Sequence, residues 1–207
     1  MYHSYIWDFD GTLFDSYPIM LEAFLKTLKD AGFDPDSREI YRILKASSSK
    51  QVAEKYQLDF IDFSARFKAY EALDERLPVS FPGTKEALQA VVDHGGKNYI
   101  LTHRDVVSTK ELFNERKILT ILIVEIVGPE NKFSPQAGPN VFELFSGKIS
   151  NWTKQTTVMI GDRAMDVLAG RGAGVQTMFY DIEGLLTDLD ADHVVHSMKE
   201  IEEIIKS

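Results

Sequence analysis

The sequence predicts an α/β protein in which an all-helical segment interrupts a parallel sheet, and two features of the 207 residues indicate this. After residue 78, short aromatic and β-branched runs alternate with helical patterns, which is typical of a parallel sheet covered on both faces. Between residues 16 and 77 we find about four helical patterns and no convincing strand. We therefore expect a Rossmann-like doubly wound parallel sheet from residues 1–15 and 78–207, with residues 16–77 as an inserted all-helical domain.

The inserted segment is divided by residues that start or stop helices. Pro18 suits a first helical turn and Gly32 suits a helix end, which predicts the first helix. Asp36 and Glu39 have capping-box spacing at the start of the second. The other two predicted helices cover residues 50–56 and 64–76, and the aromatic stripe on the last one is more typical of a core than of a substrate site.

The sheet is predicted from apolar runs that stop at turn signals. Predicted strands cover residues 5–9, 99–102, 122–127, 157–160, 176–179 and 194–195. Between them, Thr84 is expected to cap one helix, and residues 106–116 and 166–173 are expected to form two more. Ser197 and Glu200 have the spacing of a capping box that opens the C-terminal helix.

Composition narrows the class of function. The net charge is −9, with 32 acidic and 23 basic residues, so attraction to nucleic acid or to an anionic membrane is not expected. The chain contains no cysteine, which excludes a thiolate metal site and a cysteine nucleophile. Its N-terminus lacks the pattern of a secretory signal, and its longest apolar stretch is too short to cross a bilayer. We expect a cytoplasmic protein, monomer or homodimer, that acts on a small ligand.

Polar residues follow four of the predicted strands. In a parallel sheet the carboxyl ends of the strands lie at one edge, where ligands bind. These residues are Asp8, Asp10, Thr102, Lys132, Asp162 and Asp166. Because the helical segment leaves the sheet beside this edge, it is a candidate lid.

The arrangement of these residues resembles the haloacid dehalogenase-like superfamily, specifically its phosphoglycolate phosphatase-like members with a helical cap. The family's first motif, Asp-x-Asp-Gly-Thr, is similar to residues 8–12, and its fourth, Gly-Asp-x-x-x-Asp, to residues 161–166. The second, a Thr or Ser that ends a strand, is matched by Thr102. The third, a lysine usually followed by proline, is matched by Lys132 with Phe133 in place of the proline.

The residue types themselves call for a cation. Four clustered carboxylates would repel an anionic phosphate unless their charge is neutralised. Mg²⁺ with Lys132 and a protonated Asp10 would bring the cluster to zero before a phosphate arrives. With this neutralisation the site would tolerate a dianionic phosphate.

The resemblance implies a role for each acid. Asp8 would attack phosphorus and carry the phosphoryl group, and Asp10 would protonate the leaving oxygen and then activate water. The metal site would consist of Asp8, Asp10, Asp162 and Asp166. Asp8 and Asp162 would bind Mg²⁺ through side chains and Asp10 through its backbone carbonyl, while Asp166 would complete the site by orienting water or Lys132. The expected enzyme is a phosphatase of a small phosphorylated metabolite.

The resemblance also implies a phosphate-binding set. The Thr102 hydroxyl, Lys132 and backbone amides near Phe9, Asp10 and His103 would hold the phosphoryl oxygens. Two further cationic residues, Arg104 and Arg163, flank the site, and each would either pair with the acids or touch substrate.

Three other functions fit the sequence less well. A dehalogenase of this superfamily would lack the second acid, so Asp10 disfavours it. A sugar-phosphate mutase shares the core motifs, but mutases that resemble this chain generally carry a cap histidine and basic residues near the first motif, which bind a second phosphate. Asp15-Ser16-Tyr17-Pro18 has neither. A catalytically silent regulatory protein would be expected to have lost an essential acid.

Overall fold

The structure is a computed structural model, and it describes residues 2–118, 120–131, 155–186 and 189–207. It divides into two compact units. The sheet unit consists of Met1–Phe14 and Val79–Ser207, and the helical unit of Asp15–Pro78. The predicted site residues that the structure describes all belong to the sheet unit.

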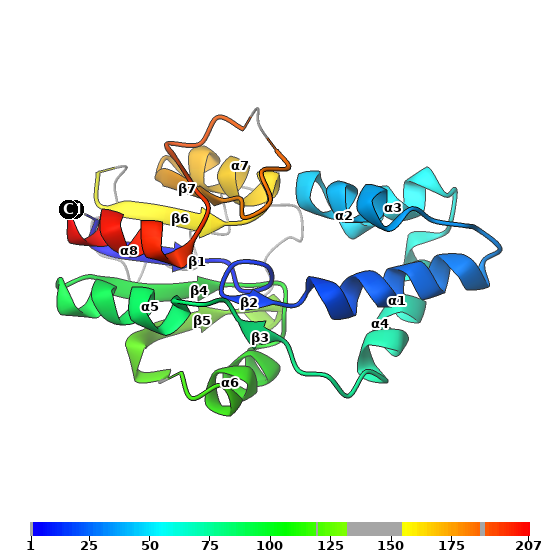
Figure 1. Cartoon of the computed structure of the whole chain (residues 1–207), viewed down its shortest axis with the longest axis horizontal. Helices are drawn as coiled ribbons and strands as arrows, with labels where there is room; N and C mark the ends of the chain where they lie inside the picture. Colours follow the sequence, from blue (N-terminus) through cyan, green and yellow to red (C-terminus); the bar gives the residue numbers. More distant parts are fainter. Residues whose placement is uncertain (1, 119, 132–154, 187–188) are drawn as a thin grey trace. The chain divides into compact units, whose positions relative to one another are not determined.

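A six-stranded sheet with parallel neighbours forms the centre of the sheet unit (Figure 1). Its order is β5 (Ile123–Val127), β4 (Lys97–Leu101), β1 (Ser4–Trp7), β6 (Thr157–Gly161), β7 (Gln176–Tyr180) and β8 (His193–Val195). β1 lies between β4 and β6, with Ile6 in register with Tyr99 on one side and Met159 on the other. The chain extends the sheet first on one side of β1 and then on the other. The carboxyl end of β1 is therefore the switch point, where ligands bind in open parallel sheets.

Helices cover both faces of this sheet. They are α5 (Thr84–Asp93), α6 (Val106–Glu115), α7 (Ala164–Gly172) and α8 (Met198–Lys206), and two short 3₁₀ turns cover Thr120–Leu122 and Pro129–Asn131. No helix in the described part of the chain is long and apolar enough to cross a membrane.

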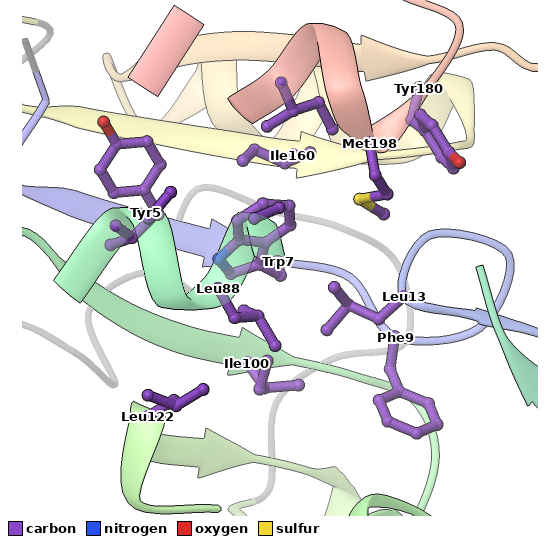
Figure 2. Packing of buried hydrophobic residues seen from close by; sticks show 14 of the residues in the cluster. Tyr5, Trp7, Phe9, Leu13, Leu88, Ile100, Leu122, Ile160, Tyr180 and Met198 are labelled. Atoms are coloured by element: carbon purple, nitrogen blue, oxygen red, sulfur yellow. The ribbon is translucent and has the colours of Figure 1, made fainter. Parts of the chain in front are cut away.

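Alternate residues of β1 pack against different helices because successive side chains of a strand point to opposite faces. Figure 2 shows Trp7 among Leu88, Ile100, Ile160 and Met198, in the cluster that includes residues of α5 and α8. The intervening residue, Ile6, belongs to a second cluster that includes Ala169 of α7. The predicted doubly wound α/β fold is therefore confirmed.

The helical unit is held by an aromatic core. Its helices are α1 (Tyr17–Asp30), α2 (Ser37–Ala46), α3 (Ser49–Lys55) and α4 (Phe60–Ala72). The Phe24 ring of α1 stacks on Phe67 of α4 with centroids 4.3 Å apart, and Phe63 lies at 5.3 Å from Phe24. Phe63 and Phe67 are 2% and 6% exposed, so the aromatic stripe on α4 is core.

Among the predicted helix starts that differ from the structure, two are explained by a side-chain hydrogen bond. The fourth helix begins at Phe60 because the Asp59 carboxylate accepts the N–H groups of Ile61 and Asp62. Thr84 is the first residue of α5 and follows the N-cap Gly83, since its hydroxyl donates instead to the Leu13 carbonyl.

The first strand ends two residues earlier than predicted. The Phe9 carbonyl accepts the N–H groups of Leu13 and Phe14, which turns the chain away from the sheet. A separate two-stranded sheet, β2 (Phe14–Asp15) with β3 (Val79–Ser80), was not predicted, because its strands are too short to show a periodic pattern.

Candidate active site

Asp8 is the first residue after β1 and is 3% exposed. Its N–H donates to the Ile160 carbonyl at 2.8 Å, which ties the end of β1 to β6. Gly11 then adopts φ +87°, a conformation that favours glycine, and its N–H donates to the Phe14 carbonyl. This tight turn brings Asp8 and Asp10 to the carboxyl edge of the sheet.

The second acidic segment joins β6 to α7. Asp162 directly follows β6, and Asp166 lies in the first turn of α7, where its Oδ2 accepts the Arg163 N–H at 3.0 Å. A Cβ atom at Gly161 would lie 2.3 Å from the Asp166 Cβ, so the close approach of Asp166 to the strand requires glycine. Packing therefore explains why the fourth motif has glycine at position 161.

Asp8, Asp162 and Asp166 converge at the sheet edge and form what we call the acidic triad. Each offers a carboxylate oxygen within 4.8 Å of the others, and all three residues are buried. Burial and the nearby Asp166 raise the pKa of Asp8 well above its usual range; Arg163 opposes this rise, while Asp162 and Asp10 add to it. The arrangement concentrates negative charge that the described protein groups only partly neutralise.

The acidic triad fits a divalent cation. The Oδ2 atom of Asp8 is buried and has no hydrogen-bond partner among the described residues, which is energetically unfavourable for a carboxylate. Carboxylate oxygens are the ligands that Mg²⁺ prefers, and a cation there would satisfy this atom and reduce the mutual repulsion of the acids. Asp8, Asp162 and Asp166 would hold the ion.

Thr12 supports the acidic triad, a role that the sequence analysis missed. Its hydroxyl is fully buried and donates to Oδ1 of Asp162 at 3.2 Å, joining the first motif to the fourth. Such a contact orients a metal-binding carboxylate. A threonine directly after Gly11 was the available signal, since the motif includes it.

Asp10 does not belong to the acidic triad, because Arg104 binds its side chain. The Arg104 Nη2 donates to Oδ1 at 2.6 Å, and Nε lies 3.2 Å from both carboxylate oxygens. The guanidinium also lies 5.8 Å from the Phe9 ring centroid. Of the two roles open to Arg104, the structure shows the ion pair.

Thr102 follows β4 and is 1% exposed. Its Oγ1 accepts the Arg104 N–H at 3.0 Å, so the hydroxyl is fixed and its own proton can be donated to another acceptor. The structure therefore links Thr102 and Asp10 through one arginine.

Three other predicted phosphate-binding residues have different outcomes. Phe9 is fully buried, with its ring stacked on Phe14 at 4.5 Å, so its side chain is structural. Desolvation and the Arg163 charge lower the pKa of His103 to about 4, against the opposing effect of Asp10, although the residue is exposed to solvent. Lys132 lies outside the described residues.

Curated relatives are similar to most of the chain. Phosphoglycolate phosphatase from Pseudomonas putida is 26% identical over 83% of the chain, a match that spans 66% of the length of that relative. Pyrophosphatase PpaX from Halalkalibacterium halodurans is 24% identical, with 97% of this chain and 95% of the relative covered. These names support the predicted enzyme class and the resemblance to phosphoglycolate phosphatases.

A solved structure and a family model are also similar to most of the chain. The crystal structure of a predicted phosphatase from Clostridium acetobutylicum superposes with a TM-score of 0.80 at 19% identity, covering 100% of this chain and 99% of the other. The model of the haloacid dehalogenase-like hydrolase family matches residues 5–180. The motifs at the sheet edge and this match agree, and the chain belongs to the haloacid dehalogenase-like hydrolase family.

Proposed function

We propose that this chain is a magnesium-dependent phosphatase that removes phosphate from a small phosphorylated metabolite through a phospho-aspartate on Asp8. The observation that carries the proposal is the acidic triad, in which a buried oxygen of Asp8 has no hydrogen-bond partner among the described residues. A carboxylate in this state serves as a nucleophile only beside a cation. The names of the relatives, phosphoglycolate phosphatase and pyrophosphatase, agree with a phosphorylated substrate.

In the first step, a carboxylate oxygen of Asp8 forms a bond to phosphorus while the bond between phosphorus and the leaving oxygen breaks. Asp10 donates a proton to that oxygen, and the product leaves as an alcohol. Arg104 holds Asp10 by both carboxylate oxygens, so the pair must open before Asp10 can deliver a proton.

In the second step, a water oxygen attacks phosphorus and Asp10 accepts a proton from it. The bond from phosphorus to Asp8 breaks, inorganic phosphate leaves, and both carboxyl groups return to their initial state. The fixed Thr102 hydroxyl and Lys132 are proposed to contact the phosphoryl oxygens in both steps.

A divalent cation held by Asp8, Asp162 and Asp166, and by the Asp10 carbonyl as the resemblance implies, would neutralise charge on the transferring group. Thr12 and Gly161 serve this arrangement indirectly. The first orients Asp162, and the second leaves room for Asp166.

The helical unit is proposed to be the cap that selects the substrate. The chain leaves the sheet unit after Phe14, six residues beyond Asp8, and returns at Val79. An insertion at the carboxyl end of the central strand begins where ligands bind in such sheets.

The proposal is tested by measuring phosphate release from a panel that includes phosphoglycolate, sugar phosphates and pyrophosphate, with MgCl₂ or with EDTA. The wild type should release phosphate only with MgCl₂. Asp8→Asn should lower the rate by at least about 10³-fold because it removes the nucleophile. Asp10→Asn should lower it by about 10²–10⁴-fold through loss of acid–base catalysis.

The matched control is Asp93→Asn, an exposed carboxylate of the sheet unit, which should keep the wild-type rate. Phosphate release by Asp8→Asn at the wild-type rate, or equal release in EDTA, would overturn the proposal. Transfer of phosphate within the substrate, without release, would identify a mutase instead.

A further inference from the structure

A third charged group, Arg163, lies against the acidic triad. Its Nη2 atom is 3.8 Å from Oδ1 of Asp166 and 4.0 Å from Oδ1 of Asp8. These distances are too long for hydrogen bonds but place a positive charge beside two of the three proposed metal ligands. The Arg163 side chain is 20% exposed and those of Asp8 and Asp166 are 4% and 10% exposed, so water screens the interaction only partly.

The position of Arg163 follows from the local chain. Arg163 directly follows Asp162 and is itself the N-cap of α7. Its backbone N–H donates to Asp166, while its side chain extends toward Asp8. The other guanidinium at this edge, Arg104, is bound to Asp10. The two arginines thus serve different carboxylates, and Arg163 is the one next to the proposed metal position.

We propose that Arg163 is a built-in counter-cation of the acidic triad, which stabilises the metal-free protein and lowers its affinity for a divalent cation. The inference rests on the metal site of the proposed function. An ion bound by Asp8 and Asp166 would share both carboxylates with the guanidinium. Two cations that interact with the same carboxylates repel each other. Without metal, the same guanidinium offsets part of the repulsion among the acids, consistent with its lowering effect on the pKa of Asp8.

The test is Mg²⁺ binding to the purified full chain, measured by titration calorimetry, together with thermal unfolding in EDTA and in saturating MgCl₂. Arg163→Gln should bind Mg²⁺ about tenfold more tightly, because the competing charge is gone. It should also unfold at a lower temperature than the wild type in EDTA. MgCl₂ should raise its unfolding temperature by more than it raises that of the wild type. A side chain with only a structural role would instead lower both unfolding temperatures in parallel.

Two further variants complete the design. Arg163→Lys keeps the charge and should bind Mg²⁺ with an affinity between those of the wild type and Arg163→Gln; it also serves if the glutamine variant does not fold without metal. Arg171→Gln removes an equal charge near the other end of α7, where Arg171 pairs with Asp190, and should leave the affinity unchanged.

The outcomes separate the two proposals. Mg²⁺ binding to the wild type with equal or weaker binding to both Arg163 variants would overturn the counter-cation and leave the phosphatase standing. Absence of Mg²⁺ binding to any of these proteins would overturn the metal site of the proposed function and this inference with it.

Discussion

The two units use buried residues for opposite purposes. In the helical unit, Phe24 stacks on Phe67 and meets Phe63 edge-on in an aromatic core, and the charged groups of Arg76 and Glu22 pair at the surface. In the sheet unit, Asp8, Asp162 and Asp166 are buried within 4.8 Å of one another. The first arrangement lowers the free energy of the folded chain, whereas the second raises it.

This difference supports the proposal that the functional site lies in the sheet unit. A protein selected for stability alone would not bury like charges together, because each raises the cost of ionising the others. Functional sites built from such clusters lower the stability of the folded chain while they provide reactive groups. The following predictions test the contrast by changing one buried group in each unit and one surface pair.

The largest change in stability is expected in the helical unit. Phe67→Ala should lower the free energy of unfolding by about 3–5 kcal/mol, because it removes a stacked ring and leaves a cavity. Ile61→Ala, on the same helix but 77% exposed, should change it by less than about 0.5 kcal/mol. Urea unfolding followed by circular dichroism measures both, and equal losses would contradict the assigned core.

A change of opposite sign is expected at Asp8. The pKa of Asp8 is raised above its usual value of 3.8, so the folded metal-free protein binds this proton more tightly than the unfolded chain does. Stability from this group is full below about pH 4 and is lost as the pH rises through the folded pKa. Asp8→Asn lacks the carboxylate, so in EDTA it should be more stable than the wild type by about 1–3 kcal/mol at pH 8 and by less at pH 5.

Thermal unfolding in EDTA between pH 5 and pH 8 provides the measurement. Asp34→Asn, which changes an exposed carboxylate of the helical unit, should show no such trend. A stability difference for Asp8→Asn that shrinks as the pH rises would show that the buried acid does not destabilise the metal-free protein.

The smallest change is expected at the surface of the helical unit. Arg76 lies 2.6 Å from carboxylate oxygens of both Glu22 and Asp74, but its side chain is 51% exposed. Arg76→Ala should lower the free energy of unfolding far less than Phe67→Ala does, since water and salt screen exposed ion pairs. Urea unfolding at low and high NaCl measures it, and a loss as large as that of Phe67→Ala would remove the contrast between surface and core.

Much of this protein was predictable because its signals are local in sequence. The alternation of strands and helices gave the parallel sheet, and Asp36 and Ser197 cap their helices at the predicted positions. Asp8, Asp162 and Asp166 were grouped because residues that follow parallel strands must share an edge, and the structure brings them together. The predicted roles of these acids remain proposals for the experiments above.

Contacts between distant segments were decided only by the tertiary structure. The pairing of Arg104 with Asp10, the hydrogen bond from Thr12 to Asp162 and the position of Arg163 depend on distances that no spacing along the chain encodes. The sequence by itself determined which residue types end each strand, because backbone propensity and hydrophobic pattern act over a few neighbours. Which charge lies against which carboxylate was decided by packing, since side chains from β1, β4 and β6 meet only after the sheet has formed.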